Sequence, residues 1–149
     1  MKILLLSPTG SFAASIDSLK VDASGDEATG VSAIANDGGP AFAAVLLGPR
    51  ALAPQNRIAS LMERSVLGRT VKRLTPYDGG FRFATASRRN PAFRSAVRDA
   101  DLIVALERDA VLAAWTALRR WGRPGARGVF GLAPARALLT SHRAQQGHR

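Results

Sequence analysis

The chain of 149 residues contains no cysteine. Disulfide bonds, thiolate nucleophiles and zinc sites that depend on sulfur ligands are therefore excluded. Histidine is also scarce, since only His142 and His148 occur, both in a basic carboxyl-terminal segment, and no Gly-x-Ser-x-Gly motif is present. Ser-His-Asp catalysis is not supported by this pattern. We expect no metal site and no cofactor, and we interpret the two histidines as exposed.

Long apolar runs are absent as well. The amino-terminal run Ile3-Leu4-Leu5-Leu6 is interrupted by Pro8 and Gly10, which is too early for the core of a signal peptide. No other apolar stretch approaches the roughly 18 residues that are typical of a membrane span. We therefore expect a cytoplasmic protein that does not insert into membranes.

Acidic residues are few in most of the chain. Lysine and arginine together number 21 against 11 acids, which gives a formal net charge of +10. Residues 41–149 hold nineteen of the basic side chains and six of the acidic ones, and no acid follows Asp109. Such a chain attracts polyanions through counterion release. We expect weak, non-specific binding to nucleic acid, although composition does not distinguish nucleic acid from phosphorylated substrates or an acidic partner.

The length and the apolar content of 46% fit one folded domain. Continuous apolar runs occur at residues 3–6, 42–47, 102–106 and 128–132, the pattern of strands covered on both faces in a parallel sheet. We predict an α/β fold, a Rossmann-like three-layer domain over residues 1–140 with a mostly parallel sheet of about four strands. Residues 141–149 are predicted to form a flexible basic tail. Leu5 and Val104 are expected on adjacent or near-adjacent strands.

Helices are expected between these strands. Ser11 is a candidate cap for a short helix to Leu19, Asn90-Pro91 is typical of a helix start, and Asp109 is a candidate cap for the helix that Gly122 ends. Further helices are predicted over residues 57–74 and from Pro134. Trp115 and Trp121 have the spacing of a buried face. Residues 20–40 are rich in turn formers and are predicted to be mostly loop, with a weak strand or a helical turn over residues 31–35.

Ligands in such sheets bind beyond the carboxyl ends of the strands. The predicted site residues at those ends are Glu107 as a catalytic residue and, for substrate binding, Thr9, Gly10, Ser11, Arg50, Arg108 and Gly131. Thr9-Gly10-Ser11 indicates either free amides that approach a phosphate or sugar, or a plain tight turn. Glu107 and Arg108 are either a hydroxyl-orienting and anion-binding pair or ordinary solvated charges. The pairs Arg88-Arg89 and Arg119-Arg120 have the same two interpretations.

Two segments carry a resemblance to a known family. The opening Lys2-Ile3-Leu4-Leu5-Leu6-Ser7-Pro8-Thr9-Gly10-Ser11 and the stretch Asp99-Ala100-Asp101-Leu102-Ile103-Val104-Ala105-Leu106-Glu107-Arg108-Asp109-Ala110-Val111-Leu112-Ala113-Ala114-Trp115 resemble the amino-terminal domain of bacterial glycosyltransferases of the GT-B type, which have two facing Rossmann-like domains. In that family the first strand leads to a glycine-containing loop near the acceptor, and a later strand leads to another loop of the cleft.

The resemblance implies the acceptor-side half of a sugar-transferring enzyme, with Gly10, Ser11, Glu107 and Arg108 lining the cleft. Two departures are evident, because residues 20–40 are acidic and glycine-rich, and because 149 residues cannot contain the second domain that binds the sugar nucleotide. A sugar acceptor and a separately encoded nucleotide-sugar-binding domain are therefore the implied partners, and the chain is expected to be inactive alone. The alternatives are a partner subunit, or a non-enzymatic module that binds polyanions through a basic set: Arg57, Arg64, Arg69, Lys72 and Arg73.

Overall fold

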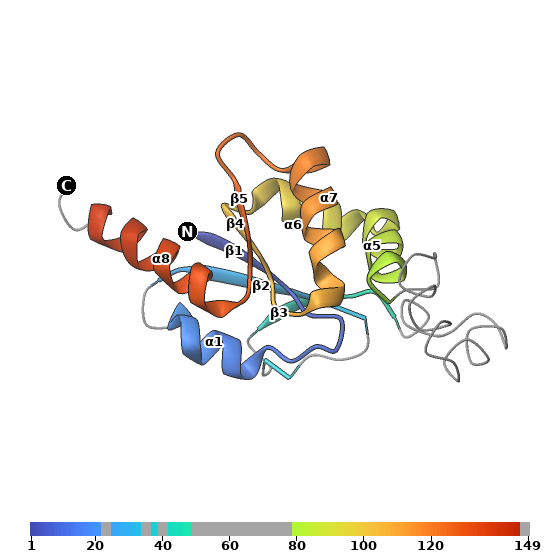
Figure 1. Ribbon diagram of the computed structural model, residues 1–149, viewed down its shortest axis with the longest axis horizontal. Helices are drawn as coiled ribbons and strands as arrows, with labels where there is room; N and C mark the ends of the chain where they lie inside the picture. The colour runs from blue at the N-terminus through green and yellow to red at the C-terminus, as the bar shows by residue number, and fades with distance from the viewer. Residues whose placement is uncertain (22–24, 34–36, 39–41, 49–78, 147–149) are drawn as a thin grey trace, which may run out of the picture.

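The computed structural model describes residues 1–21, 25–33, 37–38, 42–48 and 79–146. Five strands form one sheet in the order β3-β2-β1-β4-β5, and every neighbouring pair is parallel. The strands are β1 (Lys2–Leu6), β2 (Glu27–Ser32), β3 (Ala43–Leu46), β4 (Leu102–Ala105) and β5 (Arg127–Phe130). The predicted α/β Rossmann-like class is confirmed, with one more strand than expected (Figure 1).

The central strand β1 pairs with β4 in the predicted manner. Leu5 lies directly opposite Val104 in the register, and both side chains are fully buried. Successive side chains of a strand point to opposite faces, so Leu4 and Leu6 contact one layer of helices while Ile3 and Leu5 contact the other. This explains why the run of apolar residues in β1 is continuous instead of alternating.

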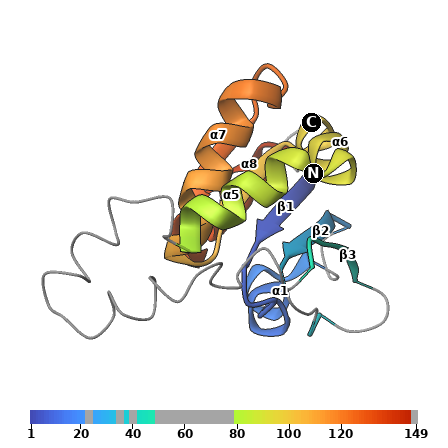
Figure 2. The same ribbon diagram turned by 90° about the vertical axis from the view of Figure 1, so that its right-hand side faces the viewer.

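Helices cover both faces of the sheet (Figure 1). On one face lie α5 (Gly79–Arg89), α6 (Pro91–Asp99) and α7 (Val111–Trp121), and on the other lie α1 (Ala13–Leu19) and α8 (Leu132–Gln146). A single 3-10 turn, η2 (Arg108–Ala110), joins β4 to α7. Figure 2 shows α5 and α7 side by side. The result is the three-layer arrangement expected for buried parallel strands.

Two expectations about the strands are corrected. Residues 20–40 contain a full strand, since β2 occupies Glu27–Ser32 and pairs with both β1 and β3, whereas only a weak strand or a helical turn over residues 31–35 was predicted. Conversely, the run at residues 42–47 is not a buried strand, since β3 lies at the edge of the sheet and its side chains are exposed or half-buried. Gly30 is the reason why strand β2 was not predicted from the sequence. A Cβ at that position would meet the Phe12 and Phe42 rings, so the close approach of these rings requires glycine.

The helices show one confirmation and one omission. The Asn90 side chain accepts a hydrogen bond of 3.1 Å from the Phe93 amide and Pro91 begins α6, as predicted. Helix α5 was not predicted, because Gly79-Gly80 reads as a turn in the sequence. The prediction for residues 57–74 lies outside the described residues. In the described part of the chain no helix is long and apolar enough to cross a membrane.

The buried face of α7 also differs from the expectation. Ala113, Ala114 and Ala117 are the buried residues, while Trp121 packs against the core only in part and Trp115 is 56% exposed. Alanine lets α7 approach the sheet and α5 closely, which turns the bulky residues of the helix outward. The prediction that Trp115 belongs to the core is therefore wrong.

The carboxyl-terminal helix extends further than expected. Helix α8 begins at Leu132, one residue after Gly131, and continues to Gln146 instead of giving way to a tail at residue 141. Its last turns are held by Arg143, whose guanidinium donates to Asp26 over 2.6 Å and to the Leu19 carbonyl over 3.2 Å. His142 is half-buried in this helix, and its Nε2 atom lies 3.0 Å from the side-chain amide nitrogen of Gln146, so it is not a fully exposed residue. His148 lies outside the described residues.

Candidate functional site

The order of the strands defines where a ligand would enter. The chain runs from β1 to one side of the sheet through β2 and β3, and then returns to the other side of β1 as β4 and β5. Open α/β sheets bind ligands at such a switch point, in the crevice beyond the carboxyl ends of the two central strands. Here the carboxyl ends of β1 and β4 lie side by side, and the Leu106 amide joins them by donating to the Leu6 carbonyl over 3.0 Å.

Glu107 joins these two strand ends through its side chain. Its Oε1 atom accepts hydrogen bonds from the Ser7 hydroxyl and from the Thr9 hydroxyl, the latter over 2.6 Å, and the Thr9 amide lies 3.3 Å away. The Ser11 hydroxyl continues the chain of polar groups at 3.3 Å from that of Thr9. The structure thus brings together Thr9, Ser11 and Glu107, three of the predicted site residues.

Ser7 organises the loop that follows β1. Its side chain is buried, and its oxygen accepts from the amides of Gly10 and Ser11, each over 3.0 Å. Since both contacts use the oxygen as an acceptor, the hydroxyl proton is directed to Glu107. The glutamate and the loop are therefore fixed by a single side chain.

The first turn of α1 is occupied by a carboxylate from the chain itself. The Asp37 side chain accepts from the Phe12 amide and, over 3.0 Å, from the Ala13 amide. These two hydrogen bonds hold the pKa of Asp37 below its ordinary value of 3.8. Phe12 occupies the N-cap position and no side chain within α1 caps the helix, so the prediction that Ser11 is the cap is wrong.

Of the two interpretations of Thr9-Gly10-Ser11, free amides and a plain tight turn, the structure does not show the free amides. The amides of Thr9 and Gly10 are engaged by Glu107 and Ser7, that of Ser11 by Ser7, and those of Phe12 and Ala13 by Asp37. A phosphate would have to displace these contacts and approach two carboxylates. The loop after β1 is therefore surrounded by hydroxyl groups and negative charge, and it does not offer the cradle of amides that phosphate-binding loops provide.

The remaining predicted residues are more scattered. Arg108 is exposed in η2 next to Glu107, and Gly131 follows β5, where its amide donates to the Ala105 carbonyl over 2.9 Å. Arg50 lies outside the described residues. Asp109 does not cap α7, whose N-cap is Ala110 without a side-chain cap, because η2 intervenes. Its carboxylate instead fills the space beside Gly79 at the start of α5.

Sequence reasoning missed two residues of this site. Ser7 belongs to the opening segment that carries the resemblance but was not predicted as a site residue, although a hydroxyl directly after a buried strand signals a polar group at the switch point. Asp37 carried no usable signal. It lies 25 residues from Phe12, in a segment interpreted as loop, and only the fold brings it to α1.

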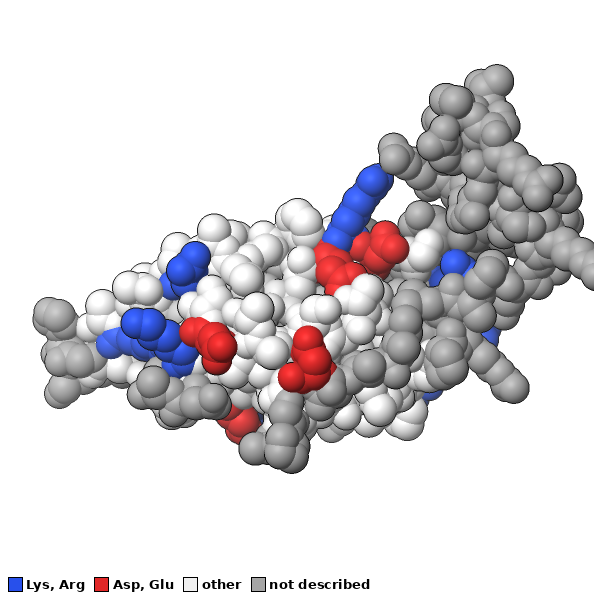
Figure 3. Space-filling model, turned by 90° about the horizontal axis from the view of Figure 1, so that it is seen from below, with Lys and Arg blue, Asp and Glu red and all other residues white. Residues whose placement is uncertain are grey.

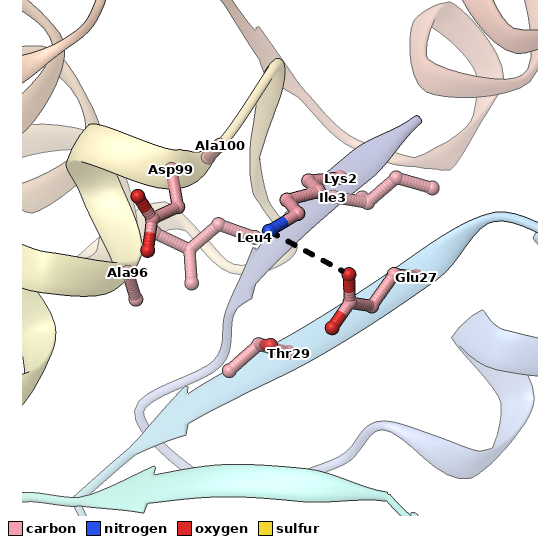
Figure 4. Close-up of a pocket in the computed structure, with 8 residues that line it drawn as sticks. All are labelled: Lys2, Ile3, Leu4, Glu27, Thr29, Ala96, Asp99 and Ala100. Atoms are coloured by element: carbon pink, nitrogen blue, oxygen red, sulfur yellow. Dashed lines mark ion pairs between the residues drawn. The ribbon is translucent and has the colours of Figure 1, made fainter.

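Hollows elsewhere on the surface lie away from this crevice. One of about 90 Å³ lies at the amino ends of β1 and β2 beside α6, where Lys2 and Glu27 form an ion pair of 3.8 Å (Figure 4). A wider one of about 440 Å³ lies between α8 and the start of β5. Both lie at the amino ends of the strands, whereas α/β sheets bind ligands at the carboxyl ends. We therefore place the candidate site at the carboxyl ends of β1 and β4.

Among the described residues, no group of three or more histidine or acidic side chains is arranged to hold a metal ion. The site thus offers the carboxylate of Glu107 with hydroxyl groups around it, next to the exposed guanidinium of Arg108. No protein-family model matches the chain, and no curated protein or solved structure shows significant similarity to it.

Proposed function

We propose that the chain is the acceptor-side half of a sugar-transferring enzyme, whose donor nucleotide sugar is held by a separately encoded domain. The observation that carries the proposal is the position of Glu107, at the switch point and among the hydroxyl groups of Ser7, Thr9 and Ser11. Carboxylates that hydrogen-bond sugar hydroxyls, and that accept a proton from one of them, are the chemistry that an acceptor requires.

The local charge supports an acceptor rather than a donor ligand. Asp37 and Glu107 lie at either end of the loop after β1, and every amide from Thr9 to Ala13 is already engaged. A nucleotide diphosphate would meet negative charge here, whereas a neutral sugar would meet hydrogen-bonding groups. The loop that the resemblance places near the acceptor is thus poorly suited to phosphate.

The proposed sugar transfer forms one bond and breaks another at the anomeric carbon of the donor. The acceptor hydroxyl forms a bond from its oxygen to the anomeric carbon of the donor, the bond from that carbon to the phosphate oxygen breaks, and the nucleotide leaves. Glu107 takes the proton of the acceptor hydroxyl. In the described part of the chain the contacts to Glu107 all involve Oε1, which leaves Oε2 as the oxygen for this proton. We assign Arg108, which is exposed next to Glu107, to balance the charge of the leaving group.

Binding is the first test, because it does not need the donor domain. Neutral monosaccharides and disaccharides should shift the amide resonances of Thr9, Gly10 and Ser11 in a titration followed by NMR, and nucleotide sugars should bind no better than the free sugar. Glu107→Gln should weaken this binding at least about fivefold, by loss of one charge-assisted hydrogen bond. Glu27→Gln, a glutamate at the opposite edge of the sheet, is the matched control. Absence of any sugar response in the loop would refute the proposal.

Transfer is the second test. The chain alone should show no turnover with a panel of sugar nucleotides, because aligning two reactants contributes about 7–11 kcal/mol and one wall of a cleft supplies little of it. Addition of the donor domain should restore turnover, and Glu107→Gln should then reduce it without a change in melting temperature. Robust turnover by the chain alone would contradict the half-enzyme proposal.

The polyanion-binding alternative keeps some support from the described arginines. Helices α5, α6 and α7 carry seven arginines and one acid, Asp99. The basic set that was predicted for this role lies outside the described residues: Arg57, Arg64, Arg69, Lys72 and Arg73. A polyanion binder should lose affinity steeply as salt is raised, and a sugar cleft should not.

A further inference from the structure

Helix α7 presents an apolar stripe to solvent. Val111, Leu112 and Trp115 are 40%, 39% and 56% exposed, although each would gain about 1.5–3 kcal/mol from burial for residues of this size. With 3.6 residues per turn, these three and Arg119 lie within an arc of about 100° on the helix. The buried alanines of α7 lie on the opposite side. The stripe is therefore a continuous surface about 12 Å long, given a rise of 1.5 Å per residue.

The carboxyl-terminal end of the stripe is cationic. The Arg119 guanidinium lies 5.0 Å from the centre of the Trp115 ring, and that of Arg120 lies 5.8 Å from the centre of the Trp121 ring. The stacking holds Arg119 over the exposed tryptophan and keeps its charge at the surface. Tryptophan and arginine are the residues most enriched where protein interfaces gain their binding energy.

The surroundings of the stripe specify the charge of its partner. Helices α5, α6 and α7 hold seven arginines and one acid, Asp99, and the turn η2 in front of α7 adds Arg108 and Asp109. The face on the α1 side of the molecule differs, since acidic and basic side chains lie next to each other there (Figure 3). A partner of the α7 stripe must therefore supply both apolar side chains and carboxylates.

We propose that the α7 stripe, Val111, Leu112, Trp115 and Arg119, is a docking surface for an acidic amphipathic helix of another protein. Leucine-like side chains of that helix would cover Val111, Leu112 and Trp115, and its glutamates or aspartates would pair with Arg119 and Arg120. A length of about 12 Å corresponds to two to three helical turns of the partner. The aliphatic pair Val111 and Leu112 disfavours nucleic acid, and a second copy would bring arginines without the carboxylates to neutralise them.

The proposal extends the proposed function by naming the chemistry through which the donor-binding protein attaches. Helix α7 follows η2, so the stripe begins at the same edge of the sheet as Glu107. A protein docked there stands next to the crevice whose second wall it would supply. The attachment is measured by binding alone and is independent of sugar binding at Glu107.

The test uses two synthetic peptides of about 18 residues with leucine on one helical face and either glutamate or lysine on the other. Their binding to the full chain is measured by fluorescence anisotropy. The glutamate peptide should bind at least about tenfold more tightly than the lysine peptide. Trp115→Ala and Arg119→Glu should each weaken its binding at least about tenfold, the loss expected from an anchor residue.

Two matched controls distinguish binding at the stripe from non-specific binding to exposed apolar or charged side chains. Leu46→Ala shortens an apolar side chain of β3 that is also 56% exposed, and Arg136→Glu reverses an exposed charge on α8, so each should change the affinity less than about twofold. Equal binding of both peptides, or equal losses in the controls, would overturn the proposal. Tighter binding of a DNA duplex or of phosphatidylserine vesicles than of the glutamate peptide would also overturn it.

The outcome is distinguishable from that of the proposed function. Glu107→Gln should bind the glutamate peptide as the unaltered chain does, and Trp115→Ala should keep the sugar response of the loop after β1. Failure of the peptide with a retained sugar response would reject the docking surface alone. Failure of sugar binding with a retained peptide response would reject the acceptor cleft alone.

Discussion

Ser7 links the loop after β1 to Glu107 through one buried hydroxyl. Ser7→Ala leaves the Ser11 amide without its acceptor, removes one of the two acceptors of the Gly10 amide, and removes a donor to Glu107. We expect a loss of about 1–3 kcal/mol in the free energy of unfolding, the range for unsatisfied buried polar groups. Urea denaturation measures it. Ser11→Ala, which removes an exposed hydroxyl from the same loop, should cost well under that amount, and equal losses in the two variants would contradict the assigned role of Ser7.

Asp37 gives the protein a specific response to acid. Its folded pKa lies below 3.8 because its carboxylate accepts from the first amides of α1. The stabilisation is therefore fully present above the unfolded pKa and is lost as the pH falls through the folded pKa. Asp37→Asn keeps an acceptor oxygen without the charge, so its stability should fall less between pH 4 and lower values. Chemical denaturation across that range measures the difference, and parallel curves would disprove the effect.

The hydrogen-bond partners of individual side chains are what the sequence could not predict. Glu107, Thr9 and Ser11 were predicted because they directly follow strands, and strand ends converge in a parallel sheet. Their individual partners could not be predicted. The amides of Phe12 and Ala13 are engaged by Asp37, which lies 25 residues from Phe12 in the sequence, and no periodicity or spacing encodes that contact.

Among the elements, β2 depends on one glycine. A Cβ at Gly30 would lie 2.6 Å from a ring carbon of Phe42 and 2.9 Å from one of Phe12, two rings that themselves pack with their centres 5.2 Å apart. Gly30→Ala should therefore cost about 1–3 kcal/mol, the usual cost of overpacking a core. Thermal unfolding measures it.

Gly128→Ala in the edge strand β5 is the control for Gly30→Ala. The closest atom to a Cβ there is the end of the Leu118 side chain at 3.1 Å, which can move by a few tenths of an ångström. Its cost should be smaller. An equal or larger cost than that of Gly30→Ala would show that the two rings do not set the requirement for glycine.

The elements that sequence reasoning located are those whose signal is local. Strands β1 and β4 are continuous apolar runs, and α6 has a capping residue followed by proline. Strand β2 and helix α5 lack such signals, because glycines stand inside the strand and at the start of the helix. The exposed stripe of α7 was misassigned for a related reason, since alanine and tryptophan both count as apolar, and only the packing distance decides which of them faces the sheet.

At the scale of the whole molecule, charge predicts binding that is weak and general. The net charge of +10 should give a mixed-sequence DNA duplex a dissociation constant of roughly 10⁻⁴ to 10⁻⁶ M at physiological salt, without sequence preference. The affinity should decrease further as salt is raised. Anisotropy titrations at several salt concentrations measure this dependence. Sub-micromolar, sequence-dependent binding would instead favour the polyanion-binding module.

The pairing of β1 with β4 has a consequence for how the chain folds. Ser7 and Glu107 are separated by 100 residues, so the second edge of β1 is paired only after a long loop closes. Non-local parallel pairing is slow, and until it is complete the apolar run of β1 presents unpaired backbone groups that other chains can join. Refolding yield should therefore fall as protein concentration rises, because aggregation at this open edge competes with the arrival of β4.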